Sequence, residues 1–361
     1  MKLEENNILF IVRTMDLGGT ENVVLQLCEI LVKYVNKIVV CSSGGVHEKK
    51  LKEMGIKHYT IPDIASKKVR DMLTIKKSIK NIIKKEEISI VHSHHRMGAF
   101  YAQIVSPKHI VKIANAHNTF YDKKLLTKFS YRNTNLIAVG DMVKKNLVDF
   151  FQIPTNQVTV IYNAVKPMQG ELDIIPIIEK EKRNGNTLIG NIGRLTEQKG
   201  MSYFIDAAEI TLKKHHNVKF FIIGDGNLKK DLIKRVENKN LKDSIFFLGY
   251  RSDVQNVIAQ LDFIVLSSLW EGLPLTPIEA FSVSKTVIGT SVDGTPEIIE
   301  DGINGFLVNP KNPFELSEKM NILIENEQTR KLLEIHAKQC YLDKFSFNKL
   351  TAEYIEYFSR L

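Results

Sequence analysis

The feature that most constrains the fold of this chain is an alternation of short apolar segments with longer helical patterns, which occurs twice. Continuous apolar strands separated by helices are typical of parallel strands covered on both faces. The first set of apolar segments covers residues 8–13, 37–43, 58–62, 88–94, 110–118, 135–140 and 158–165, and the second covers 187–193, 218–226, 244–250, 261–268 and 286–290. Helical patterns are clearest at 19–34, 69–85, 98–105, 312–324 and 327–340. The sequence therefore predicts two doubly wound α/β domains in tandem.

The alternation stops between residues 166 and 186, which we interpret as a linker. The predicted domains are then an N-terminal Rossmann-like domain over residues 1–165 and a C-terminal one over residues 187–345. An amphipathic helix follows over residues 346–361. Two domains also suit a chain of 361 residues, because a single core stops growing at about 250–300 residues.

Signals for secretion or for a bilayer span are missing from the sequence. No apolar run approaches the roughly 18–20 residues that a span needs. Residues 1–14 lack the basic, apolar and small-residue order of a signal peptide. Cys28, Cys41 and Cys340 form neither an even disulfide set nor a metal-ligand spacing. We therefore expect a cytoplasmic protein.

The positive charge is concentrated in the first half of the chain. Residues 1–165 carry 25 Lys and Arg against 14 Asp and Glu, whereas residues 166–361 carry 25 against 27. The segment 67–85 combines eight Lys and Arg with one acid, Asp71, and its apolar residues recur at helical spacing. This helix is predicted to touch an anionic membrane surface, and an ordinary solvated helix face is the alternative.

In doubly wound sheets, ligands bind at the carboxyl ends of the strands, so the loops after the strands are the place to look for chemistry. If the two domains face each other, the site is the cleft between them. Gly18 and Gly19 follow the first strand and would let backbone amides approach an anion, although a tight turn is the alternative. No G-x-G-x-x-G or P-loop motif occurs, which disfavours an NAD enzyme and a P-loop enzyme.

Several histidines follow strands of the first half. His92, His94 and His95 suggest a metal site, but no nearby carboxylate or cysteine completes a ligand set, so we do not predict one. His117 ends another strand and is better placed to face a ligand. A core or helix-capping histidine is the alternative for His117.

Two cations follow the first strand of the second half, in "GNIGRLTEQKG". Arg194 and Lys199 are predicted to straddle the start of a helix, which places a guanidinium and an ammonium beside the positive helix end. Two cations with helix amides are what a diphosphate requires.

The segment "SSLWEGLPLTPIEAFS" holds two carboxylates eight positions apart, Glu271 in a loop and Glu279 in a helix. A carboxylate accepts hydrogen bonds from two vicinal hydroxyls, which suits a sugar or a ribose. The alternative is that Glu279 complements the helix dipole and Glu271 is an ordinary loop residue.

The loop between the two carboxylates is predicted to hold a phosphate. Thr276 is the expected N-cap of the helix, and Pro277 lies in its first turn. Gly272 lets backbone amides approach a ligand, and the amides of Leu275 and Thr276 would bind the phosphate between the two sugars.

These motifs together resemble glycosyltransferase family four, the retaining GT-B enzymes also described as glycosyl transferases group 1. The resemblance covers nearly the whole chain, and it is most specific in the second half. It rests on "GGTEN", "VHSHH", "IYNAV", "IGRLTEQKG", "FLGYRSDV", "EGLPLTPIE" and "GTPEIIEDGINGFLV", in that order. The implied fold is GT-B: two doubly wound Rossmann-like domains that face a central cleft, with a C-terminal helix that crosses back to the N-terminal domain.

The resemblance implies a role for each candidate residue. Arg194 and Lys199 would bind the donor diphosphate, Glu279 the nucleoside ribose, and Glu271 hydroxyls of the transferred sugar. His117 would lie beside the reacting face of the sugar, although Asn118 stands where the family often has an acid. The other donor-binding positions that it implies are Gly18, Gly19, Tyr250, Arg251, Gly272, Leu273, Leu275 and Thr276.

The activity implied is transfer of a hexosyl group from a nucleotide sugar, UDP-sugar favoured, with retention at the anomeric carbon. The chain has no Asp-x-Asp, the motif through which the other large glycosyltransferase fold holds a metal ion, so we expect no divalent metal and no other cofactor. The expected partners are a nucleotide sugar, a glycan or lipid-linked acceptor and an anionic membrane surface, and not a nucleic acid. The expected pathway is capsular polysaccharide or other cell-envelope glycan synthesis, at the inner face of the plasma membrane.

Two other functions remain open from the sequence. A GT-B epimerase would act on a nucleotide sugar without an acceptor, and a phosphorylase of this fold would need a much longer chain. A non-catalytic glycan- or nucleotide-binding protein could use the same fold, but the set of Arg194, Lys199, Glu271 and Glu279 argues against it.

Overall fold

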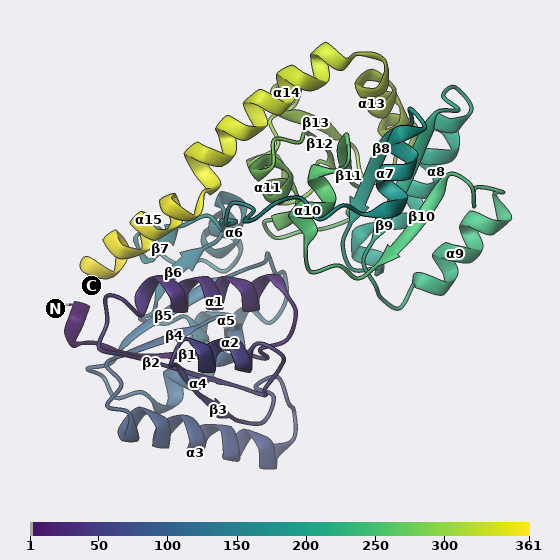
Figure 1. Cartoon of the computed structure of the whole chain (residues 1–361). Helices are drawn as coiled ribbons and strands as arrows, with labels where there is room; N and C mark the ends of the chain where they lie inside the picture. The colour runs from purple at the N-terminus through teal and green to yellow at the C-terminus, as the bar shows by residue number, and fades with distance from the viewer. Residues whose placement is uncertain (1–2) are drawn as a thin grey trace. The chain divides into compact units, whose positions relative to one another are not determined.

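The computed structural model describes residues 3–361 as two compact units. The N-terminal unit runs to Asn163 and also contains Leu350–Leu361, and the C-terminal unit is Ala164–Lys349. Figure 1 shows a parallel sheet with helices packed against it in each unit. The predicted fold class, two Rossmann-like α/β domains, is confirmed.

The N-terminal unit is built on a seven-stranded parallel sheet of order β3-β2-β1-β4-β5-β6-β7. Its strands are β1 (Asn7–Ile11), β2 (Lys37–Ser42), β3 (Lys57–Thr60), β4 (Ile90–Ser93), β5 (Val111–Ala116), β6 (Asn135–Ala138) and β7 (Val158–Val160). Its helices are α1 (Gly19–Leu31), α2 (Glu48–Glu53), α3 (Val69–Lys85), α4 (Arg96–Val105), α5 (Lys124–Ser130), α6 (Asp141–Lys145) and most of α15 (Phe347–Ser359). The strand order reverses between β1 and β4, so the loops after these two strands diverge at a position where ligands commonly bind.

The side chains of the central strands alternate between two helical layers. Leu9 and Ile11 of β1 pack with the buried face of α3 and with Tyr101 of α4. His92 of β4 faces the other layer, where its ring lies 6.0 Å from that of Phe358 in α15. In the same layer, Asn115 Nδ2 donates to Tyr354 Oη of α15 at 2.8 Å. The C-terminal helix is therefore a structural part of the N-terminal unit.

The C-terminal unit has a six-stranded parallel sheet of order β10-β9-β8-β11-β12-β13. Its strands are β8 (Thr187–Ile192), β9 (Val218–Ile223), β10 (Ile245–Gly249), β11 (Phe263–Leu266), β12 (Val287–Thr290) and β13 (Gly305–Val308). Its helices are α7 (Pro176–Arg183), α8 (Met201–Leu212), α9 (Lys229–Asn238), α10 (Val254–Ala259), α11 (Leu275–Ser282), α12 (Thr295–Ile298), α13 (Pro313–Glu325) and α14 (Glu327–Cys340). The order reverses between β8 and β11, the two strands that precede the candidate donor-binding loops.

The segment interpreted as a linker, 166–186, is partly helical and is fixed to the C-terminal unit. It contains α7, and Asn256 of α10 holds the preceding turn through two hydrogen bonds of 2.9 Å with the backbone N–H and C=O of Asp173.

No helix within residues 3–361 is both long enough and apolar enough to cross a membrane.

Candidate active site

The candidate site of the C-terminal unit is built from three neighbouring loops. Strand β11 pairs with β8 on one side and with β12 on the other. Because the strands are parallel, the loops that follow them meet at one edge of the sheet. These loops carry Lys199, Glu271 and Asp293.

The loop after β8 is fastened to the loop after β11. The backbone C=O of Gln198 accepts from Leu269 N–H at 2.7 Å, and the Gln198 side-chain amide donates to Trp270 O at 3.0 Å. Gly200 has a φ of 57°, and a Cβ there would lie 2.1 Å from Ser267 O, so only glycine fits this close approach. These contacts fix Lys199 next to the loop of Glu271.

Lys199, Ser268 and Glu271 form a compact polar cluster. Lys199 Nζ and Ser268 Oγ donate to the same carboxylate oxygen, Glu271 Oε1, at 2.5 and 2.6 Å. Only 15% of the Lys199 side-chain surface and 6% of that of Glu271 are exposed. The cluster therefore holds a charged pair largely away from water, where the attraction between the two charges is strong.

The loop after β12 holds Glu271 from the other side. Glu271 N–H donates to Asp293 Oδ2 at 2.8 Å, and Gly294 N–H donates to Gly272 O at 3.0 Å. A Cβ on Gly294 would lie 2.1 Å from Gly272 O, so the two loops could not approach this closely with a larger residue. The backbone that carries Glu271 is thus fixed from both sides.

Glu279 lies in α11, and its environment disfavours the charged form. Burial raises the pKa of Glu279 from 4.5 to about 7, although the nearby Lys199 ammonium acts in the opposite direction. The helix begins earlier than predicted, at Leu275, with Pro274 rather than Thr276 as the N-cap. Pro277 is tolerated as the third helical residue because the N–H groups of the first turn have no partner within the helix. Glu279 is therefore the fifth residue of α11 and lies beyond its first turn.

The remaining donor-site residues of this unit differ in exposure. Arg194 is exposed in the loop after β8, whereas Gly272 and Leu273 are buried, and Leu275 and Thr276 are partly buried at the start of α11. Arg194 and Lys199 straddle the start of a short 3₁₀ helix (Glu197–Lys199) and not, as predicted, that of a longer helix. Both residues precede α8, which begins at Met201. Lys199 is the last residue of the 3₁₀ helix, and Gly200 separates it from α8.

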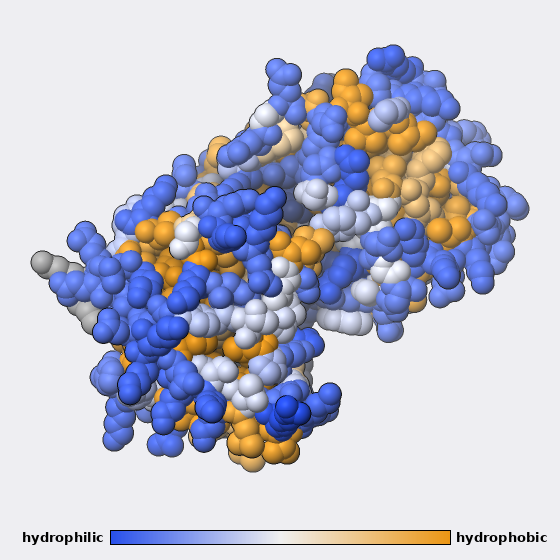
Figure 2. Space-filling model, turned by 60° about the horizontal axis from the view of Figure 1, so that its bottom comes forward, coloured by the Kyte–Doolittle hydropathy of each residue, from blue (hydrophilic) through white to orange (hydrophobic). Residues whose placement is uncertain are grey.

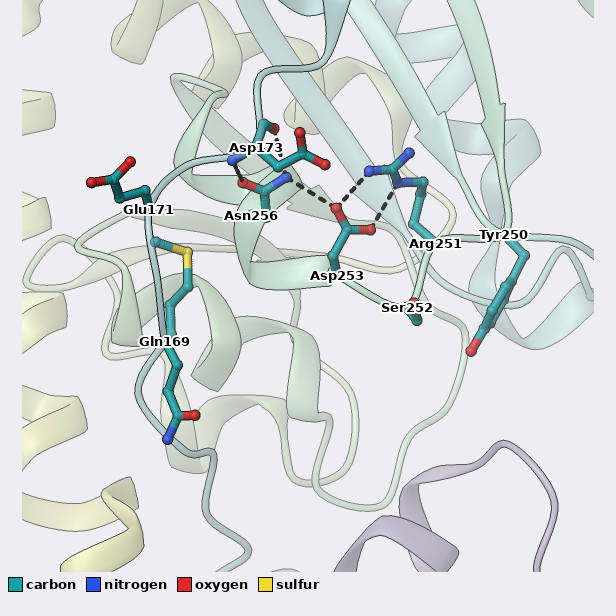
Figure 3. A pocket seen from close by; sticks show the side chains of 9 residues that line it. Gln169, Glu171, Asp173, Tyr250, Arg251, Ser252, Asp253 and Asn256 are labelled. Atoms are coloured by element: carbon teal, nitrogen blue, oxygen red, sulfur yellow. Dashed lines mark hydrogen bonds and ion pairs between the residues drawn. The ribbon is translucent and has the colours of Figure 1, made fainter. Parts of the chain in front are cut away.

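Tyr250 and Arg251 line a pocket of about 510 Å³ at the carboxyl end of β10 (Figure 3). Arg251 forms a two-bond ion pair with Asp253, at 2.8 and 2.5 Å, which lowers the pKa of the Asp253 carboxyl. Another part of the lining comes from the predicted linker, through Met168, Gln169, Glu171 and Asp173. The pocket offers one exposed aromatic ring, Tyr250, and a guanidinium held in place.

In the N-terminal unit, the glycines after β1 lie at the start of α1. Gly18 is the N-cap of α1 and Gly19 its first residue, as predicted. The Glu21 carboxylate already lies over this helix end, with Thr14 Oγ1 donating to Glu21 Oε1 at 2.8 Å. An anion that approached these amides would have to share the position with Glu21.

The histidines form a polar cluster at the ends of β4 and β5, in which His92 and His94 are buried and His117 is half-buried. His94 Nδ1 lies 3.1 Å from His117 Nε2, and His92 Nε2 lies 2.7 Å from Asn115 Oδ1. Burial lowers the pKa of His117 to about 3 and that of His92 to about 4, so both imidazoles are neutral near pH 7. His95 instead caps α4 by accepting from Met97 N–H at 3.1 Å. Before a ligand binds, His117 is therefore a neutral hydrogen-bonding group near pH 7.

Three of the polar residues that organise the site were not predicted from the sequence. Gln198, Ser268 and Asp293 touch the Lys199–Glu271 pair or its backbone. Asp293 could have been predicted from the sequence, because it follows β12, the strand next to β11, and β11 precedes Glu271.

Within residues 3–361, no three His, Cys, Asp or Glu side chains are arranged to hold a metal ion.

Sequence comparisons identify both halves of the chain. The model of "Glycosyl transferases group 1" matches residues 175–339, and that of "Glycosyltransferase Family 4" matches residues 17–169. An uncharacterised glycosyltransferase of Methanocaldococcus jannaschii is 32% identical over 282 residues, which are 75% of each chain. The Escherichia coli UDP-Gal:alpha-D-GlcNAc-diphosphoundecaprenol alpha-1,3-galactosyltransferase is 26% identical over 348 residues, with coverage of 90% of this chain and 88% of the relative.

Solved structures match the fold over nearly the full length. Anabaena HepE in complex with UDP-glucose has a TM-score of 0.83 at 19% identity and covers 98% of this chain and 100% of its own. WaaG, a glycosyltransferase involved in lipopolysaccharide biosynthesis, has a TM-score of 0.77 at 15% identity and covers 97% of this chain and 99% of its own. With its two parallel-sheet domains and its matches to both family models, the chain belongs to the glycosyltransferases of family four, group 1, with the GT-B fold.

Proposed function

We propose that this glycosyltransferase moves a hexosyl group from a nucleotide sugar, UDP-sugar favoured, to a glycan or lipid-linked acceptor with retention of configuration and without a divalent metal. The observation that carries the proposal is the cluster in the C-terminal unit where Lys199 pairs with Glu271 and acts on Glu279. It supplies a cation for phosphate and two carboxyl groups for hydroxyls within one site.

Each part of the donor has a proposed binding group. Arg194, Lys199 and the first amides of α11, at Leu275 and Thr276, bind the diphosphate. Glu279 binds the ribose, Glu271 binds sugar hydroxyls, and the pocket of Tyr250 and Arg251 binds the base. The remaining proposed groups are Gly18 and Gly19 at the start of α1, His117, and the backbone of Gly272 and Leu273.

The proposed chemistry is a same-face displacement. The bond between the anomeric carbon and the leaving phosphate oxygen breaks, and the acceptor oxygen bonds to that carbon from the same side. The departing phosphate takes the acceptor's proton. Arg194 and Lys199 stabilise the charge that develops on the diphosphate, which is the role a metal ion would otherwise have.

The acceptor is proposed from the relatives. The Escherichia coli relative is named for a diphosphoundecaprenol-linked sugar as acceptor, and a Staphylococcus aureus relative, 25% identical, for poly(ribitol-phosphate). HepE is described in complexes with UDP and with UDP-glucose. These names support a UDP-sugar donor and a cell-envelope glycan as product.

We also propose that one helical face of the N-terminal unit rests on an anionic membrane. Of the five apolar residues predicted to form the packed face of α3, Ile75, Ile79, Ile82 and Ile83 are buried and Met72 is half-buried. All eight Lys and Arg of residues 67–85 are exposed. Val69 and Leu73 of α3 are also exposed, as are Tyr121 and Leu125 at the start of α5. Helices α3, α4 and α5 pack side by side, so these residues belong to one layer. In Figure 2, blue hydrophilic side chains and smaller orange hydrophobic patches share the surface of this unit.

The test of the donor is a thermal-shift screen of UDP- and GDP-sugars, followed by transfer or hydrolysis with the best ligand. A UDP-sugar should raise the melting temperature most, and product analysis should show an α-linked sugar from an α-linked donor. Inversion at the anomeric carbon would exclude retention. A product formed without acceptor, with the sugar epimerised on the nucleotide, would exclude transfer.

A further inference from the structure

Lys199 has two competing uses in the candidate site. Its Nζ lies 2.5 Å from Glu271 Oε1, in a pair that is largely removed from water. Under the proposed function, the same ammonium group binds the donor diphosphate. Glu271 and a diphosphate are therefore rival anions for one cation.

Simultaneous binding of both anions is unfavourable. An ammonium group has three N–H donors, so it has enough donors for a carboxylate and a phosphate together. Each oxygen would then lie about 3 Å from Nζ, which places the two anions within about 5 Å of each other. At that separation two negative charges repel strongly in a site shielded from water.

An intact nucleotide sugar resolves this conflict, whereas the free diphosphate does not. The hydroxyls of a bound sugar can donate to Glu271 and replace the hydrogen bond that Lys199 gives it, and Ser268 Oγ remains as a second donor. A free nucleoside diphosphate brings the negative charge without these hydroxyls. Glu271 would then either keep its ion pair with Lys199 or lie beside the phosphate without a cation to balance its charge.

We propose that Glu271 exchanges partners during the reaction: it accepts the sugar hydroxyls while the intact donor is bound, and it returns to Lys199 when the sugar has left. The returning carboxylate weakens the hold of Lys199 on the product diphosphate. The inference rests on the proposed function and adds a role for Glu271 in discriminating the donor from the product.

The test is calorimetric titration of the full-length protein with UDP, GDP and uridine. Glu271→Gln keeps the size of the side chain and an oxygen that accepts from Ser268, but it removes the rival charge. This variant should bind the favoured diphosphate about five- to thirtyfold more tightly than the wild type. Its affinity for uridine should not change, because uridine carries no phosphate.

Three further variants isolate the cause. In a Lys199→Ala background, Glu271→Gln should give a clearly smaller gain, because the competition for the cation is gone and only the direct repulsion between the carboxylate and the phosphate is relieved. Glu197→Gln removes an exposed carboxylate two residues from Lys199 and should leave diphosphate affinity within about twofold of the wild type. Glu271→Asp retracts the charge from Nζ and should give an intermediate gain, and it serves if Glu271→Gln fails to fold.

The outcomes separate this inference from the proposed function. If Glu271→Gln binds the diphosphate equally or more weakly, or if the gain is just as large without Lys199, partner exchange is wrong while the donor site stands. If the wild type binds no nucleoside diphosphate and no nucleotide sugar, the proposed function itself fails, and this inference fails with it.

Discussion

Arg194 and Lys199 differ in their surroundings, although both are assigned to the diphosphate. Arg194 is exposed, and Lys199 is largely buried in its pair with Glu271. We predict that Arg194→Ala or Lys199→Ala raises the activation free energy of transfer by about 2–4 kcal/mol, as for other groups that stabilise developing charge. The measurement is kcat/KM in EDTA, with Lys213→Ala on the far end of α8 as an exposed control. A strict requirement for Mg²⁺ would contradict the metal-free site.

Glu279 is the residue whose protonation should affect stability near neutral pH. Burial raises its pKa from 4.5 to about 7, so the folded state favours the protonated carboxyl. The stabilising contribution is complete below about pH 4.5 and is lost as the pH rises through 7. Relative to Glu279→Gln, the wild type should therefore lose up to about 3 kcal/mol of unfolding free energy between pH 4.5 and 8. Urea unfolding of both proteins at pH 5 and pH 8 measures this, and a difference independent of pH would show that the carboxyl is not perturbed.

The sequence predicted the chemistry of single residues better than their contacts. Lys199, Glu271 and Glu279 were selected because cations and carboxylates after strands suit a nucleotide sugar, and the structure places these three together. The direct Lys199–Glu271 pair was not predicted, because residues 72 positions apart meet only through strand pairing. Thr276 was misassigned as the N-cap, because Pro274 adopts an extended conformation and is the N-cap, so the helix starts two residues earlier.

At the scale of elements, long amphipathic helices were predicted well and several short ones were missed. Helix α3 has the predicted bounds, residues 69–85, because four isoleucines at helical spacing fix both its period and its buried face. Helices α2 and α5, with six and seven residues, are too short for a hydrophobic period to be recognised. Strand β13 has only four residues within a turn-rich segment. Helix α7 was taken for a linker because the strand–helix alternation lapses there.

Helix α15 should contribute to the stability of the N-terminal unit in particular. Phe358 is 97% removed from solvent and contacts His92, and Tyr354 accepts a hydrogen bond from Asn115. We predict that Phe358→Ala lowers the unfolding free energy of this unit by about 3–5 kcal/mol, the usual cost of a large cavity. Calorimetry should show a lower transition temperature for the N-terminal unit, with the transition of the C-terminal unit unchanged. Leu332→Ala, at an exposed position of α14, is the control. Equal shifts of both transitions would contradict the assignment of α15 to the N-terminal unit.

At the scale of the whole molecule, the alternation of strands and helices determined the fold class, and the charge distribution marked the two units as different. The predicted excess of positive charge lies in residues 1–165. The sequence could show that residues 67–85 form a basic helix, but not that Val69 and Leu73 stay exposed beside the cations. Exposure depends on which helices pack as neighbours, and the contact of α3 with α4 leaves Val69 and Leu73 in solvent.

The exposed cations and apolar residues of α3 and α5 lead to a prediction for the intact protein. Near an anionic leaflet each Lys or Arg contributes about 1 kcal/mol, and this attraction is screened beyond about 10 Å at 0.1 M salt. Liposome co-sedimentation should therefore require anionic lipid and weaken as salt rises. Changing Lys76, Lys77, Lys80 and Lys84 to Glu should abolish binding, whereas changing Lys213, Lys230, Lys234 and Lys311 of the C-terminal unit should have little effect at the same net charge.

The exposed apolar residues add a part that salt does not screen. Leu73 and Leu125 have 64% and 84% of their surfaces exposed, and burial of each in the interface should contribute about 1–2 kcal/mol. Replacing both with Ser should weaken liposome binding about tenfold or more even at high salt, while transfer to a water-soluble acceptor should be unchanged. If the Lys-to-Glu variant and the Leu-to-Ser variant both bind liposomes as the wild type does, the face formed by α3 and α5 does not contact the membrane. Binding that neither salt nor the Lys-to-Glu changes reduce would assign the contact to another surface of the protein.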